Sequence, residues 1–377
     1  MLSDAEPTMS VPTPTELAIF VSGYTEDGAG PGLGCFKLMS DGSVGEKRSE
    51  NPALVNPSFV IFAGDYLVAV QEKAVGSVVV LDPLTLKVVG TAPTGGADSC
   101  HAALIGDFIW SANYSSGTAS VLPLAGVIQN NSAHSSSAPL LLEHPGSGPV
   151  AGRQSQSHAH QVTPTPWGTA LVSDLGADRV DEYALAPGDF ALLRSAQFPP
   201  GTGPRHVALK GDFMLVSGEL DGYLHVLRKT PSGDGDADEY FWRWLFKTAL
   251  AKNPQDLESA AEFYPSHIQL SDDGSKLYAA VRGPNTVLVL DVSTLESAGA
   301  GGEVPRALGV LSEVSSAGNW PRHFGLSPAK DGRASKLYVA NQLSNTVAVF
   351  DLDKNGLPGT EPVQTLDFGS PSCILIA

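Results

Sequence analysis

A short motif that recurs seven times constrains the fold of this chain more than any other feature of its sequence. Each copy places Ser, Cys, Ala or Arg directly before one aligned position, and a short run of mostly apolar residues follows it. Five of the seven copies have histidine at the aligned position. The copies read NPSFVIF, DSCHAAL, SHAHQVT, GPRHVAL, YPSHIQL, WPRHFGL and SPSCILI, aligned at Phe59, His101, His160, His206, His267, His323 and Cys373. Self-similarity repeated along a chain is the signature of a repeat architecture.

A β-hairpin pattern follows each of the first six copies. It consists of a loop, a β run, a polar turn and a second β run, as in GDFMLVSGELDGYLHVL and ASKLYVANQLSNTVAVFD. Alternating Val, Leu, Tyr and Ala with Gly, Asn or Asp between the runs is typical of hairpins. The segment 16–38 has the hairpin without a preceding motif, and the segment 370–377 has the motif without a hairpin. Together the two ends of the chain complete a seventh unit.

These repeats predict an all-β fold, a seven-bladed β-propeller over residues 17–377 in which one blade is closed by strands from both termini. Each unit has about 54 residues, slightly more than usual for a propeller blade. A pair of β-sandwiches would not explain seven phased copies. Residues 1–16 are expected to form a flexible N-terminal segment. The acidic and aromatic insertion 231–247 is interpreted as an outer blade strand with Trp242 and Trp244 on one face, the alternative being a partner-binding edge.

Composition narrows the possible partners. The formal net charge of −17 argues against nucleic acid or an anionic membrane, because both require a basic surface. An anionic small molecule would need local arginines to overcome this field. Three widely spaced cysteines form neither a disulfide framework nor a metal motif. With no secretory signal and no apolar run of membrane-spanning length, we expect a cytoplasmic protein. We also expect no cofactor.

Propeller geometry predicts where a site would lie. The inner strand of each blade lines the central channel, so the motifs supply one ring of side chains at a channel mouth. The last residue of the first β run in each hairpin, just before the turn, supplies a second ring. Its members are Tyr24, Glu72, Tyr114, Leu175, Glu219, Arg282 and Gln342, with Lys73 as the alternative to Glu72.

Residues that depart from the repeat at this mouth are the better functional candidates. A residue type shared by most blades, such as the histidine at 101, 206, 267 or 323, has a structural explanation in a repeated hydrogen bond. For His160, which stands beside His158 in HAH, the structural and functional interpretations are equally open. Arg205 and Arg322 replace the small residues found elsewhere, and Glu219 and Arg282 are charges in the second ring. Surface exposure is the alternative for each arginine.

These residue types suit an anionic substrate. Arginines bind carboxylate or phosphate through paired hydrogen bonds and stabilise a developing oxyanion or enolate. Glu219 or His160 would move a proton as general base or acid. The sequence has no nucleophile elbow, no H-E-x-x-H, no P-loop and no GxGxxG opening a helix, so it offers no support for covalent, zinc or nucleotide chemistry.

Several motifs in register carry a family resemblance over residues 17–376. They are TGGADSCHAAL, ANYSSGTASVLPL, GRQSQSHAHQV, SDLGADRVDEYAL, GTGPRHVAL, SDDGSKLYAAVRGPNTV and ANQLSNTVAVFDLD. The chain thereby resembles the lactonase family of seven-bladed propellers, which includes propeller-type 6-phosphogluconolactonases and fungal carboxy-cis,cis-muconate cyclases. The resemblance implies a metal-independent enzyme that opens or forms a lactone on a small anionic acid.

The resemblance also implies site residues. Similarity to the cyclases points to Arg205 in GPRH, Glu219 in SGEL and Arg282 in AVRGPN, whereas the cyclase histidine falls opposite Ala159, between His158 and His160. The spellings HAH, DLGADRV and GTGPRH are closer to the bacterial-type lactonases. Arg153 and Gln154 in GRQ match that branch and are either substrate-binding or loop residues. The further substrate-binding candidates are His101, His158, His206, Arg322 and Gln342.

Three functions are therefore compared. The first is hydrolysis of a sugar-acid lactone, phosphorylated or not. The second is cycloisomerisation of a muconate-like diacid, in which no water is consumed. The third is a non-catalytic propeller scaffold, because propellers host many functions. We rank them in this order.

Overall fold

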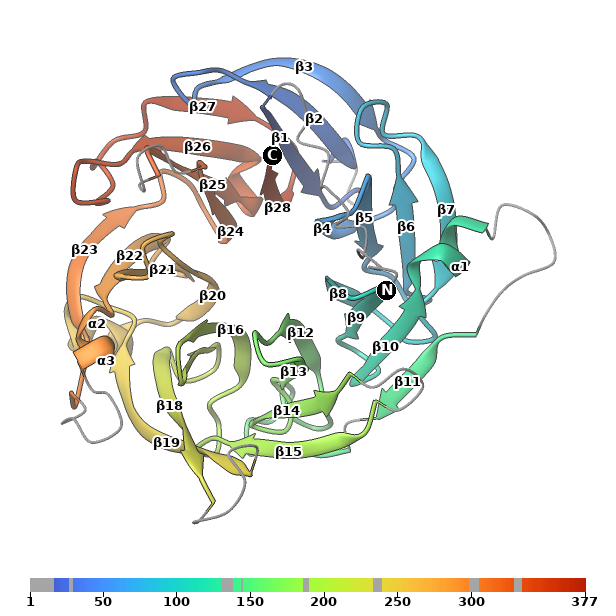
Figure 1. The fold of residues 1–377 in the computed structure, drawn as a ribbon. Coiled ribbons are helices and arrows are strands. Elements are labelled where there is room, and N and C mark those ends of the chain that lie inside the picture. Colours follow the sequence, from blue (N-terminus) through green and yellow to red (C-terminus); the bar gives the residue numbers. More distant parts are fainter. Residues whose placement is uncertain are drawn as a thin grey trace, which may run out of the picture.

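The computed structural model describes residues 17–26, 30–129, 138–143, 145–185, 190–232, 239–297, 305–328 and 334–377. The segment 1–16, expected to be flexible, lies outside the described residues. Seven four-stranded antiparallel sheets surround a central axis, which confirms the predicted propeller (Figure 1). Within the described residues, no helix is both long enough and apolar enough to cross a membrane.

Six blades are each built from four consecutive strands, with the first strand innermost. They are β4 Pro57–Ala63, β5 Tyr66–Gln71, β6 Ser77–Leu81 and β7 Val88–Pro93; β8 Ser99–Ile105, β9 Phe108–Asn113, β10 Thr118–Pro123 and β11 Leu140–Glu143; β12 Ala159–Pro164, β13 Thr169–Asp174, β14 Arg179–Ala184 and β15 Leu192–Gln197; β16 Pro204–Lys210, β17 Phe213–Gly218, β18 Tyr223–Pro231 and β19 Tyr240–Ala249; β20 Tyr264–Leu270, β21 Lys276–Arg282, β22 Thr286–Asp291 and β23 Gly309–Ser315; β24 Pro321–Leu326, β25 Lys336–Asn341, β26 Thr346–Asp351 and β27 Gln364–Asp367. Short helical segments lie in the connections: α1 Leu124–Gln129, α2 Pro254–Ser259, α3 Thr294–Ser297 and η1 Gln342–Ser344.

The seventh blade joins the two ends of the chain. Strand β28 (Pro371–Ile376) is its inner strand and pairs antiparallel with β1 (Ala18–Gly23), which is followed outward by β2 (Leu33–Leu38) and β3 (Val44–Asn51). Ile19 lies opposite Ile376 in this ladder. Figure 1 shows the blue and red ends of the chain side by side in one blade. The closure predicted from the incomplete repeats at both ends is confirmed.

The core lies between neighbouring blades rather than at the centre. Middle strands such as β17 (Phe213–Gly218) are buried on both faces, which explains their continuous apolar runs. Leu215 and Leu224 of one blade, for example, belong to the same hydrophobic cluster as Leu277 and Leu288 of the next blade. Outer strands such as β15 are mostly exposed and have mixed sequences. This packing fixes each blade, and with it the channel mouth.

The aromatic part of the 231–247 insertion forms the outer strand β19, as predicted. Trp242 lies opposite Lys229 and Trp244 lies opposite Leu227, so the two indoles share a face of the sheet. Trp242 is buried and donates its Nε1–H to Glu182 at 3.0 Å, whereas Trp244 is partly exposed and donates to His225 at 3.0 Å. The Trp242 contact attaches this strand to the preceding blade, and the Trp244 contact attaches it to its own blade.

Every inner strand has a register shift near its first residue, and this feature corrects the sequence alignment. In β12 the ladder jumps from Ala159 to Gln161, which leaves His160 as the extra, bulged residue. In β16 the ladder resumes at Val207 after Pro204, so Ala159 corresponds to Pro204. The alignment of His160 with His206 was therefore wrong by one position. The residues equivalent to His160 are Ser58, Cys100, Arg205, Ser266, Arg322 and Ser372.

Candidate active site

The predicted second ring exists in the structure. In six blades its member donates its backbone N–H to the residue that precedes the inner strand, and in the remaining blade Arg282 pairs with Tyr264, the first residue of the inner strand β20. The backbone N–H of Glu72 donates to the carbonyl of Asn56 at 2.9 Å, and that of Glu219 donates to Gly203 at 2.9 Å. These contacts select Glu72, not Lys73, as the member from the first complete blade. The two rings therefore meet at one end of the channel.

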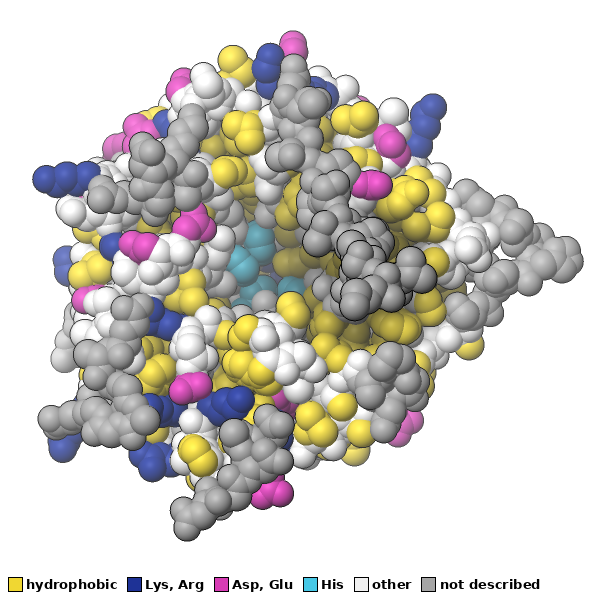
Figure 2. All heavy atoms as spheres, viewed as in Figure 1, with side chains coloured by type: hydrophobic (Ala, Val, Ile, Leu, Met, Phe, Trp, Pro, Cys, Tyr) yellow, Lys and Arg dark blue, Asp and Glu magenta, His cyan; other side chains and the backbone are white. Residues whose placement is uncertain are grey.

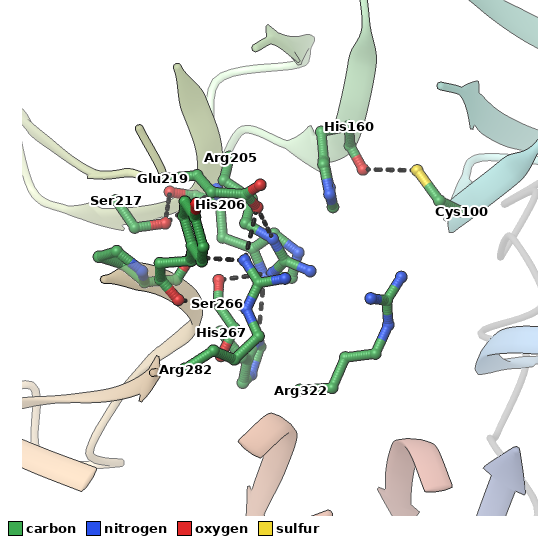
Figure 3. Close-up of polar contacts among 12 residues, drawn as sticks. Cys100, His160, Arg205, His206, Ser217, Glu219, Ser266, His267, Arg282 and Arg322 are labelled. Atoms are coloured by element: carbon green, nitrogen blue, oxygen red, sulfur yellow. Dashed lines mark hydrogen bonds and ion pairs between the residues drawn. The ribbon is translucent and has the colours of Figure 1, made fainter. Parts of the chain in front are cut away.

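Glu219 is the centre of a buried ion-pair cluster at this end. Its Oε2 lies 2.8 Å from Nε of Arg205 and accepts a hydrogen bond of 2.7 Å from Nη2 of Arg282. Its Oε1 accepts a hydrogen bond from Nη2 of Arg153. The carboxylate is only 4% exposed (Figure 3). Both oxygens of Glu219 are thus occupied by guanidinium groups.

The two buried arginines are held by backbone carbonyls, Arg205 by one of the next blade and Arg282 by those of its own blade. Arg205 occupies the bulge position of β16, and its Nη1 donates to the carbonyl of Ser266 at 2.6 Å. Arg282 ends β21 and donates through Nε to the carbonyl of Tyr264 at 3.1 Å. Because each guanidinium is fixed at one end and paired with Glu219 at the other, the cluster is preorganised.

The charges of the cluster set its ionisation state. Burial alone would raise the pKa of Glu219, but the positive charges of Arg282 and Arg205 outweigh burial and hold this pKa well below its usual range. Burial and the neighbouring Arg282 lower the pKa of Arg205 to about 9, so this side chain stays protonated at neutral pH. Glu219 is consequently a carboxylate with little basicity.

His160 faces the same space from the preceding blade. Its ring lies 5.5 Å from the ring of His206 and 5.7 Å from that of Tyr114, measured between centroids. Burial, followed by the positive charge of Arg205, holds the pKa of His160 well below its usual value, so the imidazole is neutral. Within the described part of the chain, its buried Nδ1 has no hydrogen-bond partner. Figure 3 shows its side chain directed toward the space between the arginines.

A second charged group stands at the other edge of this space. Nη2 of Arg322, from the bulge position of β24, lies 3.5 Å from Oε2 of Glu72. The hydroxyl of Tyr24 donates to the same oxygen at 2.7 Å, and the guanidinium of Arg322 lies 5.0 Å from the centre of the Tyr24 ring. Glu72 and Tyr24 were members of the predicted ring, but neither had been assigned a role from the sequence.

The loop before β12 contributes Arg153 but not Gln154 to the mouth. Nη2 of Arg153 donates to Glu219 and lies 3.5 Å from the hydroxyl of Tyr114. Gln154 is fully buried, and its Nε2 donates to the carbonyl of Leu175 at 2.8 Å and to Asp178 at 2.7 Å. Of the two interpretations of Gln154, these contacts correspond to the loop role.

Two other substrate-binding candidates flank the mouth. The ring of His158 stacks on that of Tyr114 at 4.4 Å, and its Nδ1 lies 2.9 Å from the Tyr114 carbonyl oxygen. Gln342 begins the short helix η1, and its Oε1 is buried without a hydrogen-bond partner among the described residues. His158 is thus packed against a ring residue, whereas the amide oxygen of Gln342 is buried and has no hydrogen-bond partner among the described residues.

An aromatic ring closes the channel below the charged cluster. It comprises Phe59, His101, His206, His267 and His323, with centroids of neighbouring side chains 3.9 to 5.7 Å apart. Nδ1 of His101 accepts from the backbone N–H of Val162 at 3.5 Å, and Nδ1 of His323 accepts from that of Ile374 at 3.2 Å. Figure 2 shows histidine side chains on the floor of the central hollow. At His101 and His323 the repeated histidine thus links one blade to the next.

This ring predicts acid sensitivity. Burial lowers the pKa of His101 and of His323 to about 3, below the ordinary value of 6.5. Their neutral state therefore stabilises the fold fully above pH 6.5, and this contribution is lost as the pH falls from 6.5 toward 3. Each histidine is expected to lower the free energy of unfolding by about 1.4 kcal/mol per pH unit in this range. Urea unfolding at pH 7.5, 6 and 5 measures the slope.

A single substitution checks the origin of this slope. His101→Phe introduces the residue that the neighbouring blade has at the equivalent position, Phe59. Between pH 6.5 and 3, unfolding of this variant is expected to take up about one proton fewer than unfolding of the wild type. An equal slope in the variant and the wild type would show that His101 does not titrate as proposed.

The arrangement brings most of the predicted site residues together. Arg153, Arg205, Glu219 and Arg282 form one cluster, with His160 and Arg322 facing the same space (Figure 3). His101 and His206 lie in the aromatic ring below. Among the described residues, no group of three or more His, Cys, Asp or Glu side chains is arranged to hold a metal ion.

Comparisons with known proteins agree with the fold. Residues 18–376 match the family described as "Lactonase, 7-bladed beta-propeller". A 6-phosphogluconolactonase of Bacillus subtilis (strain 168) is 29% identical over 284 residues, which cover 74% of this chain and 73% of that protein. The structure of the Pseudomonas aeruginosa periplasmic gluconolactonase PpgL superposes with a TM-score of 0.78 at 27% identity, covering 96% of this chain and 98% of that one. A putative 6-phosphogluconolactonase from Bacteroides fragilis NCTC 9343 gives a TM-score of 0.76 at 26% identity, covering 97% and 99%.

Proposed function

We propose that this chain, which belongs to the lactonase family of seven-bladed β-propellers, hydrolyses the lactone of a sugar acid at the channel mouth around Glu219. The observation that carries the proposal is the pair of buried arginines paired with Glu219, facing a neutral imidazole whose Nδ1 has no hydrogen-bond partner among the described residues. Names of relatives give the substrate class, since proteins similar to this chain are called 6-phosphogluconolactonase or gluconolactonase.

Lactone hydrolysis needs a base, an oxyanion site and an acid. His160 is neutral at pH 7 and takes a proton from the attacking water, whose oxygen forms a bond to the acyl carbon. Arg205 and Arg282 stabilise the negative charge that develops on the carbonyl oxygen. The bond from the acyl carbon to the ring oxygen then breaks, and protonated His160 returns its proton to that oxygen. The product acid releases one proton to the solvent.

Glu219 acts in this scheme as a positioning residue rather than as the base. Its oxygens are both paired with guanidinium groups, whereas Nδ1 of His160 has no hydrogen-bond partner among the described residues. Its negative charge instead keeps Arg205 and Arg282 side by side, where their mutual repulsion would otherwise separate them. The sequence left open whether Glu219 or His160 moves the proton. In this scheme His160 moves it and Glu219 positions the arginines.

The test is turnover by the purified chain. We expect it to open 6-phosphogluconolactone or unphosphorylated gluconolactone faster than the spontaneous reaction, and proton release in a pH-stat measures the rate. A folded protein that accelerates neither reaction would contradict the proposal. The same preparation is incubated with a carboxylated cis,cis-muconate, because a loss of the diene absorbance would instead indicate cycloisomerisation.

A further inference from the structure

We infer that Arg322 is the docking point for a second anionic group of the substrate, a phosphomonoester, and thereby decides between phosphorylated and unphosphorylated lactones. This inference rests on the proposed function and assigns the far end of the substrate to a residue outside the Glu219 cluster. Its evidence lies in the contacts, the position and the charge of Arg322.

The guanidinium of Arg322 is enclosed but poorly satisfied. Its side chain is only 18% exposed, and its contacts within the described part of the chain are the 3.5 Å ion pair with Glu72 and the face of Tyr24. Arg205 and Arg282, by contrast, each donate to a backbone carbonyl as well as pairing with Glu219. Enclosed polar groups are normally hydrogen-bonded. The Arg322 guanidinium has five N–H donors but only one long ion pair, so it can donate further hydrogen bonds to an acceptor on a bound ligand.

The position of Arg322 suits a substrate with two functional ends. Figure 3 shows its guanidinium across an open space from Glu219, Arg205 and Arg282, with His160 on a third side. Burial is the main cause that lowers the pKa values of His160, Arg205 and Arg282, and the positive charge of Arg322 adds to it in each case, as expected for groups that face one space. When the lactone carbonyl of a substrate lies at the Glu219 cluster, the opposite end of that substrate lies beside Arg322.

The charge balance of the mouth favours a dianion. Four arginines face two glutamates there: Arg153, Arg205, Arg282, Arg322, Glu72 and Glu219. With His160 neutral, this set has two more positive than negative charges, although the whole chain has a net charge of −17. A phosphomonoester dianion balances that excess, whereas a neutral sugar lactone leaves it uncompensated. Phosphate oxygens also match the fork of N–H donors on a guanidinium.

The experiment compares two substrates in matched variants. Arg322→Gln is expected to lower kcat/KM for 6-phosphogluconolactone by about 30-fold or more, mostly through KM, and to change kcat/KM for gluconolactone less than about threefold. Arg243→Gln, the same substitution on the exposed outer strand β19, should leave both values unchanged. Inorganic phosphate should inhibit the wild type competitively and the Arg322→Gln variant about tenfold more weakly.

The possible outcomes separate this inference from the proposed function. Wild-type turnover of gluconolactone without preference for the phosphorylated lactone would overturn the role of Arg322 and leave the hydrolase standing. Equal losses on both substrates in Arg322→Gln would also overturn it, because a merely structural role would give that result. No turnover of either lactone by the wild type would contradict the proposed function itself. Phosphate inhibition that does not depend on Arg322 would place the anion elsewhere.

Discussion

Replacing Glu219 with glutamine is expected to reduce lactone turnover by about 10²- to 10³-fold, the range found when one oxyanion-stabilising group is lost. The amide has nearly the shape of the carboxylate but no charge. Arg205 and Arg282, both buried and fixed by backbone carbonyls, would then repel each other without compensation. The loss should appear in kcat, since the arginines are needed most when charge develops on the substrate.

The same substitution is expected to destabilise the fold. Removing one partner from a buried ion pair costs about 3 kcal/mol or more, because the remaining charges stay buried. The pKa of Glu219 in the folded protein lies well below 4.5, so its contribution is fully present above pH 4.5 and is lost as the pH falls below that value. The difference in unfolding free energy between wild type and variant should therefore stay constant above pH 4.5 and shrink below it.

Two further variants test whether the effects of Glu219→Gln come from the loss of its buried negative charge. Glu361→Gln removes an exposed carboxylate and should change neither turnover nor stability. Glu219→Asp keeps the charge but shortens the side chain, so it should retain more stability than Glu219→Gln while turnover still falls. If Glu219→Gln remained folded and fully active, the arginine pair would not be the oxyanion site.

The fold was predictable because each copy of the repeat contains local sequence patterns that are typical of strands and turns. Each blade repeats the same buried inner strand, hairpin and turn, and the unmatched halves at the two ends require closure. The second ring was predictable for the same reason, since one position in every hairpin leads to one channel mouth. Glu219 and Arg282 could therefore be placed together although 63 residues separate them.

His160 and Arg153 were candidates from the sequence, but the alignment of His160 and the contact made by Arg153 were not predicted. His160 was misaligned because HAH offers two histidines and because this blade has Ala159 where most blades have a proline before the bulge. Proline precedes the bulge in five blades, at Pro57, Pro204, Pro265, Pro321 and Pro371, and alignment on Ala159 as its substitute would have given the correct position. The contact from Arg153 to Glu219 comes from a loop with no equivalent in other blades, so no repeat could indicate it.

Replacing His160 is the second substitution with a large expected effect. His160→Gln should lower kcat by about 10²- to 10⁴-fold with little change in KM, because a general base acts in the chemical step rather than in binding. The pKa of His160 lies well below 6.5, so the wild-type rate should not decline as the pH falls through 6.5, in contrast to an enzyme with an ordinary histidine base. Steady-state rates between pH 5 and 8 in the wild type measure this profile.

A chemical rescue distinguishes catalysis by His160 from a structural role. His160→Gly leaves a space the size of an imidazole beside the arginines, and added imidazole should restore part of the lost rate, which a structural defect would not allow. His225→Gln serves as the matched control, because His225 is also buried but is hydrogen-bonded to Asp221 and Trp244 of its own blade. That control is expected to lose stability and keep its kcat. A His160→Gln variant with kcat within about threefold of the wild type would assign the base to another group, and Glu219, despite its low pKa, would be the remaining candidate in the cluster.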